Sequence, residues 1–223
     1  MSASSSHPST LRLAIAAGAP SPQLAALLAL QRAEEPETIV LVQEVASGDL
    51  ARGFEDGSFD TGIALSAAAT IPDLNSQQLW VDELALAVPL RSPLLGYAKV
   101  SLEALLHYPM FRWCLQACDA LSRQVDAVFE PEERPIQEIA SFELMTVLVA
   151  AGYGVGIAPR SRIVQARGWG VAMRPLANGP YLISTQLLRP SHGSPPAVER
   201  FAERATTVAE TFPVLPGDCR PIM

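Results

Sequence analysis

The segment ASFELMTVLVAAGYGVGIAP, residues 140–159, carries glycines at three alternate positions and decides how this part of the chain folds. A dinucleotide-binding loop requires a strand first, then the glycines, then a helix whose N-terminus faces the pyrophosphate. Here the apolar helical pattern comes first. Its stripe has the i, i+3, i+4, i+7 spacing of a helix and consists of Leu144, Val147, Leu148 and Ala151. Apolar residues on both flanks of this stripe predict that the helix is largely buried.

The glycines end this helix and open a strand. Gly152 falls at the C′ position, where a left-handed backbone conformation favours glycine. The stretch GVGIAP, residues 154–159, is short, partly β-branched and closed by a proline, which is typical of a strand. Gly156 within it indicates tight strand packing. The segment therefore predicts a helix–strand junction and not a phosphate-binding loop.

The composition indicates a packed globular chain. Hydrophobic residues make up 49% and charged residues 17% of its 223 residues, against a usual charged share of about 25%. No apolar run approaches the roughly 20 residues of a membrane span. The net charge of −7 argues against nucleic-acid binding by this chain, because phosphate binding needs clustered Lys and Arg. Residues 1–10 lack the features of a signal peptide, so we expect a flexible leader or linker remnant on a cytoplasmic protein.

Three cysteines, Cys114, Cys118 and Cys219, cannot form a complete set of disulfides and suit a reducing compartment. Cys114 and Cys118 are four residues apart, which raises the possibility of a redox or metal pair. The three histidines are not spaced as metal ligands, however. We expect core or loop thiols, no metal and no cofactor.

Strand and helix patterns alternate from residue 11 onward. Strands are expected at 11–17, 38–45 and 59–65, and helices start at Ser21-Pro22 and at Ser47. The four consecutive apolar residues within 38–45 predict a strand buried on both faces of a parallel sheet. This order, with short connections, predicts a right-handed α/β unit.

A second series begins after a longer strand at 79–89. Its expected strands are 110–113, 136–140, 154–159, 171–176 and 181–190; a turn is expected at 130–135, and a last helix starts at Ser194-Pro195 and buries residues that include Phe212. Two short α/β series joined near Pro89 predict two lobes with a cleft between them. The expected boundaries are 11–88 with 178–212 for lobe I, 89–177 for lobe II, and 213–223 for a C-terminal tail.

Several blocks, in order, resemble the effector-binding domain of LysR-type transcriptional regulators. The frame from LRLAIAA (11–17) to FEDGSFDTGIAL (54–65) resembles the start of that domain. LWVDELALAVPLRSPL (79–94) resembles its hinge strand, with Ser92 where histidine is usual, and VSLEALLHYPMFRW (100–113) is similar to the next block. EIASFELMTVLVAAGYGVGIAP (138–159) is the most recognisable block. The resemblance covers about residues 11–205.

The resemblance implies an α/β fold of the type 2 periplasmic-binding-protein kind, with two Rossmann-like lobes and a small-molecule effector in the cleft. It also implies a ligand-sensing regulatory domain that forms a homodimer or homotetramer by antiparallel pairing of lobes. The helix-turn-helix of that family is not in this sequence, so DNA binding is expected only through such a missing N-terminal domain. The chain is either an excised regulatory part or a natural stand-alone relative. Ser92 and the segment from Cys114 to Cys118 depart from the family pattern.

The expected effector site follows from the topology, because ligands of open α/β sheets bind beyond the carboxyl ends of the strands. Helix N-termini offer unpaired N–H groups there. The expected effector-binding residues are Gly18, Ala19, Ser21, Ser47, Leu65, Ser66, Leu115, Gln116, Ser141 and Phe142. Gly18 lets a backbone approach a ligand closely. For Ser21, Ser47 and Ser141 two roles stay open, simple helix capping and effector contact.

Two other functions occur on the same two-lobed frame. A solute-binding protein of a transporter would need a signal peptide or a lipidation cysteine, and residues 1–10 have neither. An enzyme would need converging catalytic groups, whereas no histidine lies in an expected strand-end loop and no Ser–His arrangement or carboxylate pair converges. We therefore expect a regulatory domain without catalytic activity.

Overall fold

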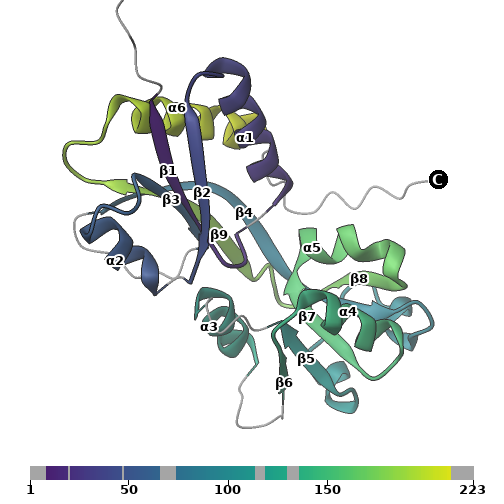
Figure 1. Cartoon of the computed structure of the whole chain (residues 1–223). Coiled ribbons are helices and arrows are strands. Elements are labelled where there is room, and N and C mark those ends of the chain that lie inside the picture. Colours follow the sequence, from purple (N-terminus) through teal and green to yellow (C-terminus); the bar gives the residue numbers. More distant parts are fainter. Residues whose placement is uncertain are drawn as a thin grey trace, which may run out of the picture. The chain divides into compact units, whose positions relative to one another are not determined.

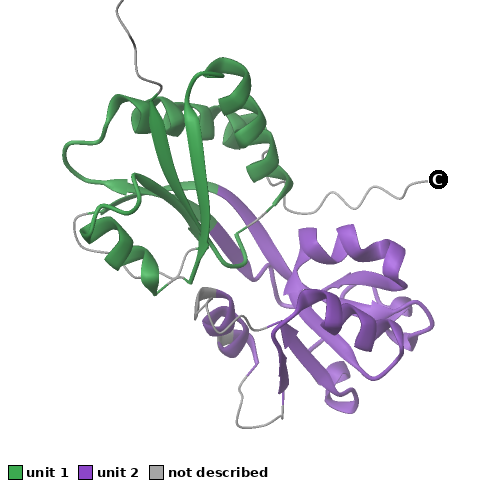
Figure 2. Cartoon of the chain, viewed as in Figure 1, with its two compact units in different colours: residues 1–79, 185–212 green, residues 80–184, 213–223 purple. Residues whose placement is uncertain are grey.

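The computed structural model describes residues 9–19, 21–46, 48–65, 74–113, 119–129 and 136–211. The chain is an α/β protein, as predicted, and it divides into two compact units (Figure 2). Unit 1 consists of residues 1–79 and 185–212, and unit 2 of residues 80–184 and 213–223. The chain passes between the units within β4 (Leu74–Pro89) and again within β9 (Leu182–Pro190).

Unit 1 is a mostly parallel sheet with helices. Its strands lie in the order β2 (Ile39–Val45), β1 (Thr10–Ala16), β3 (Thr61–Leu65) and β9 (Figure 1). β1 is parallel to β2 and to β3, and β9 is antiparallel to β3. Helices α1 (Pro22–Glu34) and α2 (Asp49–Glu55) connect the parallel strands, and α6 (Pro196–Thr211) packs against α1. The parallel strands and their connecting helices confirm the α/β unit predicted from residue 11 onward.

The predicted burial of strand 38–45 on both faces is wrong. β2 lies at the edge of its sheet, and Ile39, Leu41 and Val42 are 49%, 54% and 54% exposed. The centrally placed apolar strand is β1, whose residues from Leu13 to Ala16 are buried. A run of apolar residues predicts a strand but does not tell its place in the sheet, because that depends on which strands pair beside it. The edge of unit 1 therefore exposes apolar side chains.

Unit 2 contains a mixed sheet. Its strands lie in the order β4, β7 (Val155–Pro159), β5 (Met110–Trp113) and β6 (Ile136–Ile139), with β8 (Val171–Pro175) paired to β4. β4 is antiparallel to β7 and β8, and β5 is parallel to β6 and β7. The helices are α3 (Asp119–Val128), α4 (Phe142–Ala150) and α5 (Arg160–Gln165), with short 3₁₀ turns η1 (Pro93–Gly96), η2 (Glu103–His107) and η4 (Ala166–Trp169).

The helix–strand junction predicted at 140–159 is confirmed. Gly152 has a φ of 85°, and its N–H donates to the Val149 carbonyl at 2.9 Å. The Tyr153 N–H donates to the Leu148 carbonyl at 3.1 Å, which completes a Schellman cap. Gly156 lies in β7, where a Cβ atom would come within 3.0 Å of the Met145 sulfur. Glycine at 152 thus ends a helix, and glycine at 156 allows the helix to pack on the strand.

The predicted buried face of α4 is wrong. Leu144 and Val147 are 51% and 50% exposed, and the helix instead buries Phe142, Met145, Thr146 and Val149. Both faces of this helix carry apolar residues, so helical periodicity fits two stripes equally well. The packing of Met145 against β7 selects the stripe that faces the core.

Several predicted features lie outside the described residues. They are the turn at 130–135, Phe212, and the cysteines Cys114, Cys118 and Cys219. Ser92, which departs from the family pattern, caps η1 by accepting a hydrogen bond from the Leu94 N–H at 3.2 Å. None of the helices in the described ranges has the length and apolar character needed to cross a membrane.

Candidate functional site

In unit 1, the loops that follow the parallel strands begin at the same sheet edge. Ala16 of β1 pairs with Val45 of β2, and the Ala17 N–H donates to the Val45 carbonyl at 3.0 Å. The chain then turns at Gly18, whose φ is 87°, and the Ala19 N–H donates back to Ala16 at 3.0 Å. This conformation favours glycine. The Gly18 turn therefore presents backbone, with little side chain, at the carboxyl ends of the strands.

Ser21 begins helix α1 directly after this turn. Its backbone is extended, and its Oγ accepts a hydrogen bond from the Leu24 N–H at 3.2 Å. Pro22 occupies the first helical position, as predicted. The Ser21 hydroxyl acts as an N-cap. Pro22 has no N–H and the Ala25 N–H donates to the Ser21 carbonyl, so the Gln23 N–H is the donor of the first turn that Ser21 leaves over. Its capping role is confirmed, and an effector contact stays a prediction.

The remaining predicted residues of unit 1 lie at the ends of β2 and β3. Leu65 is the last residue of β3 and is buried, opposite Thr185 of β9. Ser47 and Ser66 lie outside the described residues. Helix α2 starts at Asp49, and Gly48, which has no side-chain cap, occupies its N-cap position. This is one residue later than the predicted cap, and such a shift is usual for the end of a short helix.

A hollow of about 390 Å³ opens beside the end of β2 and α2. Its charged lining residues are Glu44, Asp49 and Asp56 against Arg52, and Arg52 is already paired with Asp49 at 3.3 Å. The excess of carboxylates disfavours an anion in this hollow.

In unit 2, the predicted residues also follow neighbouring parallel strands. Trp113, the last residue of β5, pairs in register with Ile139 of β6. The Trp113 indole N–H donates to the Ala140 carbonyl at 3.2 Å, which fixes the start of the loop after β6. Leu115 and Gln116, which follow Trp113 in the chain, lie outside the described residues.

Ser141 caps helix α4 and also holds a carboxylate. Its Oγ accepts from the Leu144 N–H at 3.1 Å and lies 3.0 Å from Glu143 Oε2, to which the hydroxyl donates. The backbone N–H of Glu143 and the Ser141 hydroxyl lower the pKa of the Glu143 carboxylate. Capping by Ser141 is confirmed. A ligand that accepts a hydrogen bond from the Ser141 hydroxyl must displace the Glu143 carboxylate, which accepts it now.

Phe142 is an anchor at the start of α4. It is buried and packs edge-on against Trp113, with ring centroids 5.6 Å apart. The Arg162 guanidinium lies 4.8 Å from the centroid of the Trp113 ring. This contact places a cation over the aromatic pair. A small hollow of about 170 Å³ adjoins it, lined by residues that include Phe142, Arg162 and Trp169.

Trp113 and Arg162 are not among the site residues expected from the sequence. Trp113 is the last residue of the predicted strand 110–113, so the sequence already places it at the carboxyl end of that strand. Arg162 lies in α5, a helix that the sequence pattern does not indicate, because Pro159 is typical of the end of a strand.

The described site residues form one set in each unit. Gly18, Ala19, Ser21 and Leu65 belong to unit 1, and Ser141 and Phe142 to unit 2. Both sets offer backbone N–H groups and a serine at a helix start, which suits a small polar or anionic molecule. Within the described ranges, no three His, Cys, Asp or Glu side chains lie together as metal ligands would.

The model of the LysR substrate binding domain family matches residues 4–210. The chain belongs to this family. The match confirms the resemblance that the sequence blocks carried and favours a regulatory domain over a transporter's solute-binding protein. A comparison with curated protein sequences finds no match.

Solved structures of this family have the same fold as the chain. The BenM effector binding domain with its effector benzoate is 18% identical, with a TM-score of 0.81, over 91% of this chain and 93% of that one. The QuiR effector binding domain in complex with shikimate is 18% identical, with a TM-score of 0.75, over 91% of this chain and 97% of that one. Full-length CbnR in complex with target DNA is 17% identical, with a TM-score of 0.77, over 90% of this chain and 71% of that one. The LysR substrate-binding domain thus has the type 2 periplasmic-binding-protein-like fold expected from the resemblance.

Proposed function

We propose that the chain senses a small-molecule effector for a LysR-type transcriptional regulator, and that the effector binds at the strand-end loops. The observation that carries this proposal is that α1 and α4 each begin with a serine cap directly after a strand that lies parallel to its neighbours. Family membership and the benzoate and shikimate complexes of similar domains support it. We expect DNA to be bound through another domain of the regulator; a similar regulator, full-length CbnR, has been solved in complex with its target DNA.

The proposed role is regulatory, in the cytoplasm and without catalysis. Effector binding changes DNA affinity through coupling of about 1–3 kcal/mol, which is typical of allosteric proteins. The proposed contacts are those expected from the sequence: Gly18, Ala19, Ser21, Ser47, Leu65, Ser66, Leu115, Gln116, Ser141 and Phe142. The two helix N-termini favour an effector with an anionic or strongly polar group.

The effector contact of Ser47 can be separated from capping. We expect Ser47→Ala to weaken effector binding by roughly 0.5–1.5 kcal/mol for a neutral hydrogen bond, or about 1.5–3 kcal/mol for a carboxylate. The effector is first found by a thermal-shift screen of small organic acids, and affinity is then measured by calorimetric titration.

Ser101→Ala is the matched control, because the Ser101 hydroxyl accepts a hydrogen bond from the Ala104 N–H at 3.2 Å and Ser101 is not a proposed effector contact. It should lower the free energy of unfolding by about 0.5–1.5 kcal/mol and leave effector affinity unchanged. Equal affinities of wild type and Ser47→Ala would remove Ser47 from the site and shift the proposal to Gly18 and Ser141.

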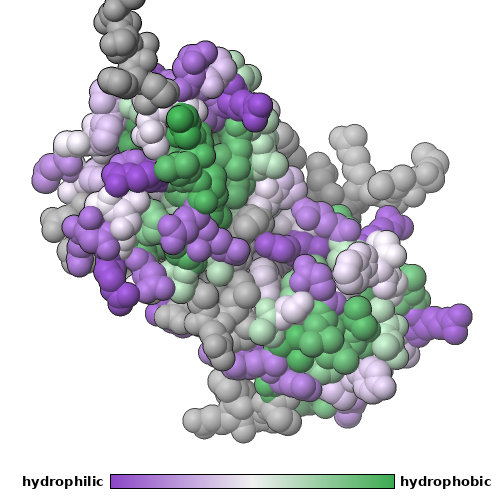
Figure 3. All heavy atoms as spheres, viewed as in Figure 1, coloured by the Kyte–Doolittle hydropathy of each residue, from purple (hydrophilic) through white to green (hydrophobic). Residues whose placement is uncertain are grey.

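We also propose that the LysR substrate-binding domain self-associates as a homodimer or homotetramer. Each unit exposes apolar side chains that water disfavours: Ile39, Leu41 and Val42 on β2, and Leu144 and Val147 on α4. Figure 3 shows apolar side chains gathered over each of these elements. An exposed apolar edge strand is a pairing surface that folded proteins usually cover. A symmetric dimer covers the same patch on both partners.

A charge on β2 should dissociate the assembly. We expect Leu41→Lys to sediment as a monomer at tens of micromolar protein, where wild type is dimeric or larger. Leu90→Lys is the matched control, because Leu90 is equally exposed but lies in the turn after β4. A monomeric wild type with no concentration dependence would refute self-association, and dissociation by Leu90→Lys would refute the assignment to β2.

A further inference from the structure

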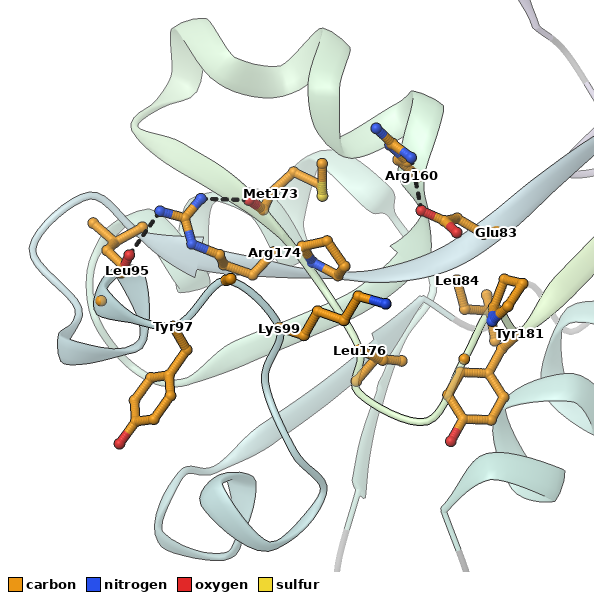
Figure 4. Close-up of a pocket in the computed structure, with 15 residues that line it drawn as sticks. Glu83, Leu84, Leu95, Tyr97, Lys99, Arg160, Met173, Arg174, Leu176 and Tyr181 are labelled. Atoms are coloured by element: carbon orange, nitrogen blue, oxygen red, sulfur yellow. Dashed lines mark hydrogen bonds and ion pairs between the residues drawn. The ribbon is translucent and has the colours of Figure 1, made fainter. Parts of the chain in front are cut away.

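A pocket of about 790 Å³ lies within unit 2, and its lining includes none of the proposed effector residues that the structure describes (Figure 4). Its walls come from β4, the segment 95–99, β8 and the segment 176–181. The volume is within the roughly 300–1,000 Å³ of small-molecule sites. The pocket is therefore large enough for an organic ligand.

The pocket carries more positive than negative charge. Its charged lining residues are Lys99, Arg160 and Arg174 against Glu83. Arg160 is paired with Glu83 at 2.8 Å. Arg174 donates to the carbonyl oxygens of Leu95 at 2.8 Å and Met173 at 2.9 Å. Carbonyl groups are neutral, so these two hydrogen bonds do not neutralise the positive charge of Arg174. Its buried Nε has no partner among the described residues. In a chain of net charge −7, this pocket is a local site for an anion.

Lys99 is the group best placed to meet that anion. Figure 4 shows its side chain extending into the pocket, with its amino group between Arg174 on one side and Leu84 and Tyr181 on the other. Within the described ranges, the ammonium makes no hydrogen bond or ion pair. Lys99 is also the only lysine of the chain, since every other long cationic side chain is arginine. A lysine ammonium on a flexible stem can follow a ligand carboxylate.

The remaining lining is largely apolar. It includes Leu84, Leu95, Met173 and Leu176, with the rings of Tyr97 and Tyr181 at opposite ends in the close-up view (Figure 4). Such walls bury hydrocarbon, and the tyrosine rings offer flat faces for stacking. A ligand that complements both the positive charge and the apolar walls of the pocket has an anionic group and an apolar body.

We propose that this pocket is an accessory site for a small carboxylate with an apolar body, bound through Lys99. The lining shares no residue with the described strand-end effector residues, and the proposal does not depend on their assignment. Lys99 binds the carboxylate, Arg174 adds positive potential, and the apolar walls hold the hydrocarbon.

The test uses the full chain with naphthoate and its uncharged analogue naphthamide as probes. Reductive methylation with isotope-labelled formaldehyde keeps the charge of Lys99 and gives one side-chain NMR signal, because the chain has a single lysine. We expect naphthoate to shift this signal, and calorimetry to show about tenfold weaker binding of naphthamide.

The variant Lys99→Met should lose about tenfold in naphthoate affinity, because it removes the charge and keeps the apolar stem. Its melting temperature should match wild type, since Lys99 is exposed and unpaired within the described ranges. Arg91→Met is the control, because it removes one exposed positive charge outside the pocket lining and should leave naphthoate affinity unchanged.

Three results would overturn the proposal: no naphthoate binding at millimolar concentration, equal affinity of naphthoate and naphthamide, or wild-type affinity of Lys99→Met. Loss of naphthoate binding in Ser141→Ala with wild-type affinity in Lys99→Met would place the carboxylate at the strand-end residues instead.

Discussion

Replacing Gly154 by alanine should lower the free energy of unfolding of unit 2 by about 3 kcal/mol or more, which places it among the more damaging single substitutions. A Cβ atom at this position would lie 2.3 Å from the Pro109 carbonyl oxygen. The same oxygen accepts the Val155 N–H at 2.9 Å, the hydrogen bond beside the start of β7. Backbone cannot move away as a flexible side chain would, so the alanine must push β7 away from β5.

Gly168→Ala is the matched control for this prediction. Gly168 lies in the same unit, and a Cβ atom there has no neighbour within 4 Å. We expect it to be neutral or slightly stabilising, because alanine reduces the conformational freedom of the unfolded chain. Chemical denaturation followed by tryptophan fluorescence measures both variants. If Gly154→Ala unfolds at the same denaturant concentration as Gly168→Ala, the close contact with Pro109 does not constrain the fold.

Features set by local chemistry could be predicted from the sequence. The serine caps at Ser21 and Ser141, the left-handed Gly152 and the strand 110–113 depend on a few adjacent residues, and the structure has each of them. The alternation of strands and helices likewise predicted the α/β class, because it reflects periodicity within short windows. These local features placed Gly18, Ser21 and Ser141 directly after strands.

Features set by tertiary position could not be predicted. The exposure of β2 depends on its place at the end of the described strand order, and the buried face of α4 depends on its packing against β7. The contact of Arg162 with Trp113 and the pocket around Lys99 join residues far apart in the chain. No sequence window contains such a contact, so the charge arrangement of the pocket emerges only in the folded chain.

Glu35→Gln should destabilise unit 1 by roughly 2–3 kcal/mol at neutral pH, because it removes a carboxylate that joins α1 to α6. Glu35 follows the end of α1 and is ion-paired with Arg200 and with Arg204, the latter at 3.1 Å. The hydrogen bond from Arg200 is the main cause that lowers the pKa of Glu35 to about 2. Arg204 is itself buried, so the variant also leaves part of a buried charge without its partner.

The sign of the pH dependence follows from this lowered pKa. The folded state holds Glu35 ionised to lower pH than the unfolded state, whose value is 4.5. The stability contributed by Glu35 is therefore complete above about pH 4.5 and is lost as the pH falls towards 2. Urea denaturation at several pH values should show the difference between wild type and Glu35→Gln shrinking through this range. Glu37→Gln, which removes an exposed carboxylate two residues away, should match wild type at every pH. A difference for Glu35→Gln that stays constant from pH 7 to the acid limit would show that ionisation of Glu35 does not link α1 to α6.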